Sequence, residues 1–257
     1  MEKIILITGA SSGFGEAAAR KFASEACRLV LAARRIDKLQ KLAEELQDLC
    51  PVYAAAMDVT SQESVEQFFK DLPQAFRDID VLVNSAGLAL GLEPAHEANF
   101  AQWQTMIDTN ITGLLRVTHA VLPSMVARDT GHIINLGSTA GNWPYPGGNA
   151  YGATKAFVQN FSRALRADLL GKHVRVTNIE PGLAETEFST VRFNGDTEKA
   201  DKVYAGTKPL RAQDIAEIIH WVHAMPAHVN VNTLEVMPVC QAWSSLSINR
   251  NMESADQ

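Results

Sequence analysis

Short, almost continuous apolar runs alternate with longer amphipathic runs along the whole chain, and this alternation limits the possible folds most strongly. The apolar runs cover residues 3–8, 28–33, 51–59, 79–87, 131–138, 174–182 and 233–239. Strands that are apolar throughout must be covered on both faces, which is typical of parallel sheets. Strands that alternate with helices build such a sheet through right-handed crossovers. The sequence therefore predicts a single, doubly wound α/β domain with seven parallel strands flanked by helices.

The amphipathic runs predict the helices and the limits of this domain. They cover residues 15–26, 37–49, 61–72, 100–128 and 149–171. Proline disrupts helix interiors, so the run 100–128 is expected to break or bend near Pro123. We expect the domain to cover residues 1–248. Within it, the polar and irregular stretch 185–210 is long enough to form a substrate lid, and residues 249–257 are expected to form a flexible tail.

Composition and charge exclude several classes of protein. Hydrophobic residues make up 46% and charged residues 20% of the 257 residues, as in ordinary soluble domains. The formal net charge is −6 and no run of Lys or Arg is present, which argues against a nucleic-acid partner. No apolar run is long enough to span a membrane. His220 and His223 are three residues apart in an amphipathic run, but without an evident third ligand we expect no metal site.

The three cysteines, Cys27, Cys50 and Cys240, are an odd number and form no C-x-x-C pair. This pattern argues against a disulfide framework or a zinc site. The first predicted strand begins at residue 3, which leaves no room for a signal peptide. We therefore expect a reducing, cytoplasmic location.

A glycine-rich turn, "TGASSGFGEA" at 8–17, joins the first strand to the first helix. Its glycines permit a tight turn and a close approach of a ligand, and the helix start offers free N–H groups to a pyrophosphate. This pattern predicts a Rossmann-type dinucleotide site, and a merely tight turn is the alternative. The residues assigned to cofactor binding in this loop are Gly9, Ser11, Ser12, Gly13, Phe14 and Gly15.

The same turn also fits G-x-S-x-G, in which Ser11 would be the nucleophile of a hydrolase. That mechanism needs an oxyanion loop from an earlier strand, an acid and a histidine. No earlier strand precedes the turn, and none of the seven histidines stands in a suggestive setting. The hydrolase is the weaker reading of the turn.

The end of the second strand indicates which dinucleotide binds. NAD-binding proteins usually carry an acidic residue there for the ribose diol. Here the strand ends "LAARR", with Ala33 at the acidic position and Arg34 and Arg35 after it. Guanidinium groups suit a 2′-phosphate, so NADP is the predicted cofactor. Asp58 and Val59, which end the third strand, are expected to flank the adenine.

Four further residues follow in a suggestive order. Asn110 lies in the long helical run, Ser138 ends the fifth strand, and Tyr151 and Lys155 lie in "YGATK", one helical turn apart. Together with TGxxxGxG, the Asp-Val pair, "NSAG" at 84–87 and the Pro-Gly pair, they make the chain resemble the short-chain dehydrogenase/reductase family from end to end. A half-exposed helix pair is the alternative for Tyr151 and Lys155.

This resemblance implies catalytic roles. Tyr151 would be the proton donor in reduction and the base in oxidation, with its pKa lowered by the positive charges of Lys155 and the oxidised nicotinamide. Lys155 would also hold the nicotinamide ribose, Ser138 would bind the substrate oxygen, and Asn110 would anchor a water for proton exit. The further cofactor residues that it implies are Asn84, Ala86, Gly87, Tyr151, Lys155, Pro181, Gly182, Leu183 and Thr186.

The distal third of the chain is similar to NADP-dependent 3-hydroxy acid dehydrogenases, which act on serine, allo-threonine and related acids and reduce malonic semialdehyde. Such a substrate carries a carboxylate. Arg192, in the expected lid, is the candidate cation, with a plain surface arginine as the alternative. Trp143 and Tyr145 are expected to line the substrate pocket with Ser138 and Tyr151.

The resemblance also implies a homotetramer, paired through the helical runs 100–128 and 149–171. The second run carries Phe157, Phe161 and Leu165 at four-residue intervals, and this stripe can face either the sheet or a partner helix. A catalytically idle NADPH-binding regulator on the same fold is a further alternative.

Overall fold

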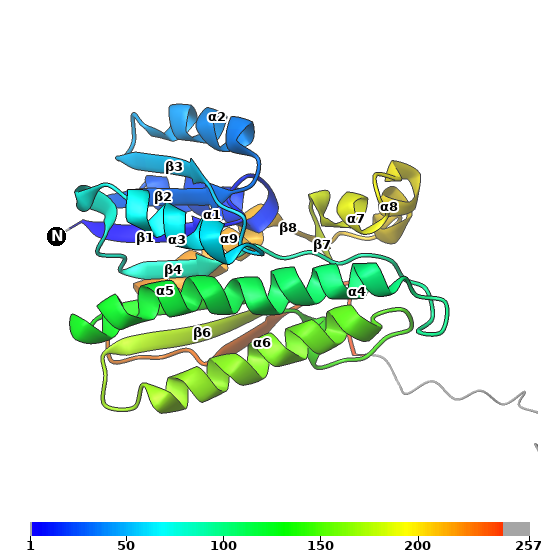
Figure 1. The fold of residues 1–257 in the computed structure, drawn as a ribbon. Coiled ribbons are helices and arrows are strands. Elements are labelled where there is room, and N and C mark those ends of the chain that lie inside the picture. The colour runs from blue at the N-terminus through cyan, green and yellow to red at the C-terminus, as the bar shows by residue number, and fades with distance from the viewer. Residues whose placement is uncertain (1, 244–257) are drawn as a thin grey trace, which may run out of the picture.

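The computed structural model describes residues 2–243, and these form one layered α/β domain (Figure 1). Its central sheet has the strand order β3-β2-β1-β4-β5-β6-β9, and all neighbouring strands are parallel. The predicted seven-stranded parallel sheet is therefore confirmed. The strands are β1 (Lys3–Thr8), β2 (Cys27–Ala33), β3 (Val52–Ala56), β4 (Val81–Asn84), β5 (Gly131–Leu136), β6 (Val174–Pro181) and β9 (Thr233–Val236).

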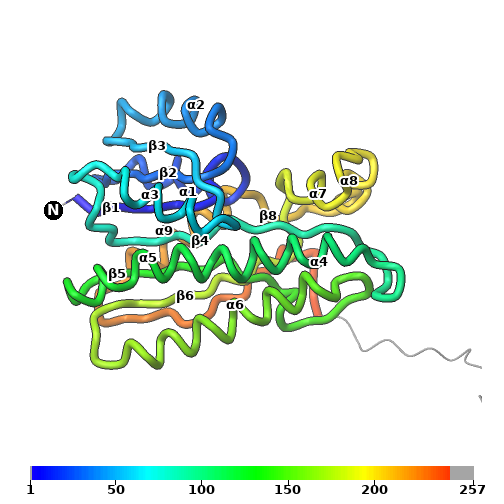
Figure 2. Tube along the Cα trace, in the orientation of Figure 1, coloured from blue at the N-terminus to red at the C-terminus, as the bar shows by residue number. Residues whose placement is uncertain are grey.

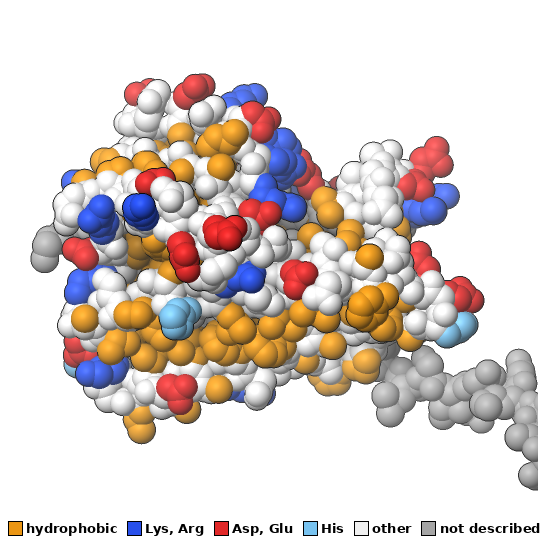
Figure 3. Space-filling model, in the orientation of Figure 1, with side chains coloured by type: hydrophobic (Ala, Val, Ile, Leu, Met, Phe, Trp, Pro, Cys, Tyr) orange, Lys and Arg blue, Asp and Glu red, His pale blue; other side chains and the backbone are white. Residues whose placement is uncertain are grey.

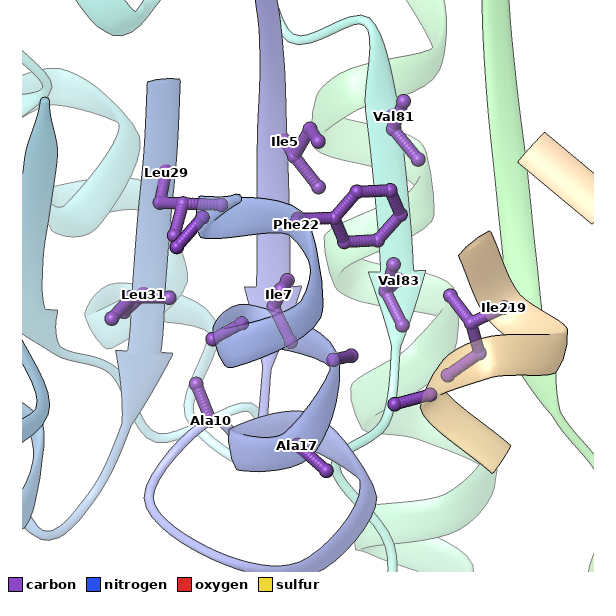
Figure 4. Close-up of a cluster of buried hydrophobic side chains, with 14 of the residues drawn as sticks. Ile5, Ile7, Ala10, Ala17, Phe22, Leu29, Leu31, Val81, Val83 and Ile219 are labelled. Atoms are coloured by element: carbon purple, nitrogen blue, oxygen red, sulfur yellow. The ribbon is translucent and has the colours of Figure 1, made fainter. Parts of the chain in front are cut away.

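Helices cover both faces of this sheet. One face packs against α1 (Gly13–Ala23), α2 (Ile36–Leu46) and α9 (Ala212–Ala224), and the other against α3 (Gln62–Asp71), α5 (Leu114–Ala127) and α6 (Asn149–Asp168). Strand β1 shows why. Ile5 and Ile7 face the first layer with Phe22 and Ile219 (Figure 4), whereas Ile4 and Leu6 face the second. Successive side chains of a strand point to opposite faces, so an entirely apolar strand needs both layers.

The long helical run is interrupted at a different place from the one predicted. Helix α4 (Phe100–Ile107) passes through a wide π-helical turn, η2 (Asp108–Gly113), directly into α5. Pro123 lies inside α5, so the helix does not break at this residue as one form of the prediction had it. The wide turn carries Asn110, whose side chain is held by chain segments outside the helix.

The expected lid is not irregular. It holds two short helices, α7 (Glu187–Arg192) and α8 (Thr197–Tyr204), together with a small parallel pair of strands, β7 (Ala184–Glu185) and β8 (Leu210–Arg211). The trace in Figure 2 shows both helices beyond the end of the sheet toward which the strands run. Short 3₁₀ turns occur at Gln74–Phe76 (η1) and Thr139–Gly141 (η3).

The three cysteines are unpaired, with Cys27 and Cys50 buried and Cys240 exposed. None of the helices within residues 2–243 has the length and apolar character that crossing a membrane requires. The predicted tail at 249–257 lies outside the described residues.

Candidate active site

Two adjoining cavities open at the carboxyl ends of the strands. The first, about 290 Å³, lies above β1, β2, β3 and β4. The second, about 340 Å³, lies beyond β5 and β6 and is bounded by α7 and by the segment after β9. Ligands of open α/β sheets bind at this edge, where loops to opposite faces diverge. Phe188 in α7 lines both cavities, so a ligand spanning them would touch this helix.

The glycine-rich loop is shaped for a close backbone approach. Gly9 and Gly13 have φ angles of 65° and 56°, which only glycine adopts freely. A Cβ atom on Gly9 would lie 2.9 Å from backbone atoms of Ala86, and one on Gly15 would lie 2.6 Å from the Gly9 carbonyl oxygen. No side chain caps the start of α1. The loop therefore presents an open helix start to the first cavity, as an anionic group such as a pyrophosphate requires.

Cations gather at the outer rim of the first cavity. Arg34 and Arg35 line it beside Ala33. The Arg35 guanidinium is held by the loop, because Nε donates to Ser11 Oγ (3.2 Å) and Nη2 donates to Ser12 Oγ (2.7 Å). No carboxylate stands at position 33 to repel an anion. The arrangement fits a phosphate on the adenosine ribose.

The structure brings most of the predicted cofactor residues together, but not all of them. Asn84 does not line the first cavity, because its amide is buried and donates to Thr118 Oγ1 and Asn135 Oδ1, each at 2.9 Å. Gly15 serves the loop's packing instead of the cavity wall. Those that line the first cavity are Gly9, Ser11, Ser12, Gly13, Phe14, Arg34, Arg35, Asp58, Val59, Ala86, Gly87 and Thr186.

Tyr151 and Lys155 lie buried in the first turns of α6, and Lys155 lines neither cavity. Lys155 Nζ donates to the carbonyl of Leu136 at the end of β5 (2.7 Å) and lies 5.8 Å from the centre of the Tyr151 ring. A Cβ on Gly87 would lie 3.5 Å from this Nζ, an ordinary contact distance, and 3.3 Å from Asn110 Oδ1, so Gly87 lies beside both groups. Tyr151 lines the second cavity together with Ser138.

Asn110 lies directly behind the lysine. Its Oδ1 accepts from the backbone N–H of Leu88 (2.9 Å), and its Nδ2 donates to the Leu88 carbonyl (2.8 Å) and to Thr154 Oγ1 (3.1 Å). These three bonds tie the wide turn η2 to the segment after β4 and to α6. Widened helical turns of this kind often occur at functional sites.

The pKa values differ from the expectation for Tyr151. Burial raises the pKa of the Tyr151 phenol to about 12, against the opposing effects of a hydrogen bond with Ser138 and the charge of Arg192. Burial lowers the pKa of Lys155 to about 8. Burial thus dominates the pKa of Tyr151 here, and the predicted lowering by Lys155 together with the oxidised nicotinamide stays a prediction. A buried phenol and a buried ammonium each disfavour their charged form, and this outweighs a charge nearly 6 Å away.

Six aromatic side chains and Arg192 are among the residues that line the second cavity. The guanidinium lies 5.7 Å from the ring centre of Tyr145, 5.4 Å from that of Tyr151 and 5.8 Å from that of Phe188, and it donates to Tyr145 Oη. Its buried Nε has no partner among the described residues. A planar cation held against rings, with one donor still free, is suited to an anionic ligand group.

Two tryptophans that line the second cavity, Trp143 and Trp243, share one carboxylate as hydrogen-bond acceptor. Glu235 in β9 accepts from the indole N–H of Trp143 (2.8 Å) and of Trp243 (3.0 Å). The two indoles, whose centres are 6.0 Å apart, come from segments a hundred residues apart. Trp143, Tyr145, Gly182 and Leu183 line this cavity, as predicted for the first two; Pro181 lines neither cavity.

Several lining residues were missed by sequence reasoning. Most carry no chemical signal of their own, because they are small or apolar and reach the cavities through loops. Glu187 directly follows Thr186, a predicted cofactor residue, and Trp243 follows the predicted strand 233–239. These positions in the sequence were the only indication that the two residues belong to the site. The missed residues are Ala33, Met57, Thr60, Ser85, Leu88, Thr109, Glu187, Phe188 and Val191 in the first cavity, and Thr139, Ala140, Pro144, Ala184, Phe188, Ser189, Val203, Tyr204, Met237, Gln241, Ala242 and Trp243 in the second.

The hydrolase alternative finds no support in this geometry. Ser11 Oγ accepts from Arg35. All seven histidines fall within the described residues, and none lines either cavity. A serine nucleophile needs a histidine within hydrogen-bond reach.

Comparison with known proteins decides the family. Residues 3–196 match the family described as short chain dehydrogenase. The chain belongs to this family. It is 56% identical to the NADP-dependent 3-hydroxy acid dehydrogenase YdfG of Salmonella typhi, over 96% of this chain and 100% of that protein. It is 53% identical to sulfoacetaldehyde reductase 2 of Chromohalobacter salexigens, over 98% and 100% of the two chains.

A solved structure matches this short-chain dehydrogenase along nearly its whole length. It is the closed form of a serine dehydrogenase complexed with NADP⁺, with 53% sequence identity and a TM-score of 0.94. The match covers 96% of this chain and 99% of the other. The overall fold thus has a counterpart in a solved relative.

Proposed function

We propose that the protein is an NADP-dependent oxidoreductase that acts on a small 3-hydroxy acid or on its 3-oxo or semialdehyde counterpart. The observation that carries this proposal is the place of Tyr151. Its buried phenol lines the second cavity together with Arg192, and its ring packs on Phe188, which also lines the cavity with the phosphate-suited rim. The names of the relatives support the same class of reaction and cofactor.

When bound, NADP(H) supplies or accepts the hydride. Tyr151 gives its proton to the substrate oxygen during reduction, and its raised pKa keeps that proton in place at neutral pH. Ser138 donates a hydrogen bond to the same oxygen. Lys155 holds the nicotinamide ribose, and its charge favours the phenolate that remains after the proton has left. Asn110 holds a water behind Lys155 for exchange of the proton with solvent.

The cofactor residues fall into three groups. The loop Gly9–Gly15 and the start of α1 hold the pyrophosphate, and Arg34 and Arg35 hold the 2′-phosphate. Asp58 and Val59 flank the adenine. Asn84 stabilises the carboxyl end of β4 through its hydrogen bonds to Thr118 and Asn135. Nearer the nicotinamide the proposed residues are Ala86, Gly87, Pro181, Gly182, Leu183 and Thr186.

Arg192 is the proposed partner of the substrate carboxylate. It is the charged side chain that lines the second cavity, and its position over the Tyr151 ring would place the bound carboxylate beside the reacting carbon. Trp143 and Tyr145 form the walls that exclude water. The segment 185–210 is the proposed lid, and its helix α7 carries Arg192.

A substrate panel tests this function. With NADPH, we expect malonic semialdehyde to be reduced, and with NADP⁺ we expect serine, allo-threonine or 3-hydroxypropionate to be oxidised, each followed by cofactor absorbance. Sulfoacetaldehyde belongs in the panel, because Arg192 would suit a sulfonate as well. Binding of NADPH without turnover of any panel member would favour an idle regulator. Labelling of Ser11 by a serine-directed phosphonate would favour a hydrolase.

We also propose a homotetramer with a reducing, cytoplasmic location. Hydrophobic side chains form a band over α4, α5 and α6 (Figure 3), where Phe157 and Ile107 are 36% and 38% exposed and the rings of Phe157 and Phe161 stack at 6.0 Å. Leu165, by contrast, is buried against the sheet. A band of this kind is typical of a protein interface.

Light scattering at micromolar concentration should give a mass about four times that of the chain. Phe157→Glu should lower this mass, because a charge placed within the band cannot be buried between subunits without a partner. A monomeric unaltered protein would contradict the proposed assembly.

A further inference from the structure

One of the protein's own carboxylates, Glu187, pairs with two cations beside the first cavity. Arg35 Nη1 donates to Glu187 Oε2 (3.0 Å), and Lys38 Nζ donates to Glu187 Oε1 (2.8 Å). Both cations come from the start of α2, and Glu187 is the first residue of α7 in the proposed lid. A bidentate acceptor thus bridges two cations at the rim where a 2′-phosphate would bind.

This bridge spans chain segments far apart in sequence. About 150 residues separate Glu187 from its two partners. Apart from this carboxylate, the Arg35 guanidinium donates hydrogen bonds only to Ser11 and Ser12 of the phosphate loop among the described residues. The carboxylate is therefore the ionic contact that joins the lid helix to the cofactor rim. It is held as an anion, because the hydrogen bonds from Lys38 and Arg35 lower the pKa of Glu187.

The helix that begins with Glu187 ends with Arg192. Five residues of helix span about 7.5 Å. Between them, Phe188 packs on the Tyr151 ring, with ring centres 5.6 Å apart. One short, stiff element therefore contacts the cofactor rim at its first residue and the proposed substrate cavity at its last.

We propose that Glu187 takes the place of the cofactor's 2′-phosphate in the free protein and competes with it for Arg35 and Lys38. When the phosphate binds, it draws both cations away from the carboxylate and repels Glu187, so the first turn of α7 is released from α2. Lys38 then becomes a third cation of the 2′-phosphate site. The inference rests on the proposed function, because it assumes that an NADP-type cofactor binds at this rim.

The test uses two ligands that differ only in this phosphate, adenosine 2′,5′-bisphosphate and 5′-AMP, in titration calorimetry. Glu187→Gln should bind the bisphosphate about three- to tenfold more tightly than the unaltered protein, because a competitor has been removed from a half-exposed site. Its affinity for 5′-AMP should not change. Glu185→Gln is the matched control, since it removes the same charge two residues earlier, and it should shift neither affinity by more than about twofold.

Hydrogen exchange provides the second measurement. In the unaltered protein, the bisphosphate should raise the exchange of amides in 187–193, whereas 5′-AMP should not. In Glu187→Gln the same amides should already exchange fast without ligand. Weaker binding of the bisphosphate by Glu187→Gln would overturn the proposal, since Glu187 would then orient the cations instead of competing. Unchanged affinity in Glu187→Gln would overturn it too. Equal affinity of the unaltered protein for both ligands would instead show that the NADP assignment is wrong.

Discussion

Tyr151→Phe is expected to lower the turnover rate at least about a hundredfold, with NADP⁺ binding nearly intact. A hundredfold loss corresponds to about 2.7 kcal/mol of activation free energy, which is the usual scale for removing a general acid. The ring lies in a buried apolar setting against Phe188, and phenylalanine fills the same space without a polar atom. The fold should therefore survive the change.

The control for this variant is Tyr53→Phe, which removes a hydroxyl far from both cavities. Tyr53 lies in β3, where its ring packs against Phe68 and Phe76. We expect normal turnover in this control. Cofactor affinity, measured by fluorescence titration, separates loss of chemistry from loss of binding. Near-normal turnover in Tyr151→Phe would refute the assignment of the proton donor.

The pKa of Tyr151 gives the two reaction directions different responses to pH. A phenol with a pKa of about 12 is protonated at neutral pH, so reduction has its acid in place. Oxidation of the alcohol needs the phenolate, and the population of phenolate rises with pH. We therefore expect kcat/KM for oxidation to increase with pH up to about 8, the pKa of Lys155, below which that residue keeps its charge, while kcat/KM for reduction does not increase. The increase should be absent in Tyr151→Phe.

Arg192→Met is expected to raise KM for malonic semialdehyde or serine by about ten- to a hundredfold, which corresponds to about 1.4–2.7 kcal/mol. A small hydroxy acid offers few apolar contacts, so a charge-assisted hydrogen bond to its carboxylate carries much of its recognition. Methionine retains an apolar stem over the rings of Tyr145 and Phe188, which limits the damage to packing.

The comparison that decides the role of Arg192 uses a neutral substrate. An uncharged ketone or alcohol of similar size has no group for the guanidinium to bind, so its kcat/KM should hardly change. Equal losses for acid and neutral substrates would show that Arg192 only supports the lid through its contact with Tyr145. The carboxylate would then be held by another group.

The sequence predicted the sheet well because strands such as β1 and β4 are apolar on both faces, and a run of that kind has few other stable environments. It predicted the order of Ser138, Tyr151 and Lys155 because these residues stand on regular elements at characteristic spacings. The wide turn at Asn110 was not predictable. The bonds that hold it go to Leu88, 22 residues away, and to Thr154, so nothing local in the chain marks it.

The same physical limit explains the other misses. Pro123 is a strong local signal, but α5 runs through it in a well-packed layer between Val117, Val121 and Met125. The pKa of Tyr151 depends on burial, which a spacing of four residues does not reveal. The ion pairs of Glu187 and the shared carboxylate of Trp143 and Trp243 join segments about 90 to 150 residues apart.

The two cavities also differ in how much of the chain must exist before each can form. Every residue that lines the first cavity lies between Gly9 and Val191, whereas the second needs Trp243. Its floor depends on β9, because the Gly182 N–H donates to the Val236 carbonyl (2.7 Å) and the Leu183 N–H to Gln241 Oε1 (2.7 Å). As a nascent chain leaves the ribosome from its N-terminus, all residues for the cofactor cavity emerge before the last strand. A growing chain thus carries all the residues of the cofactor cavity before it carries all those of the substrate cavity.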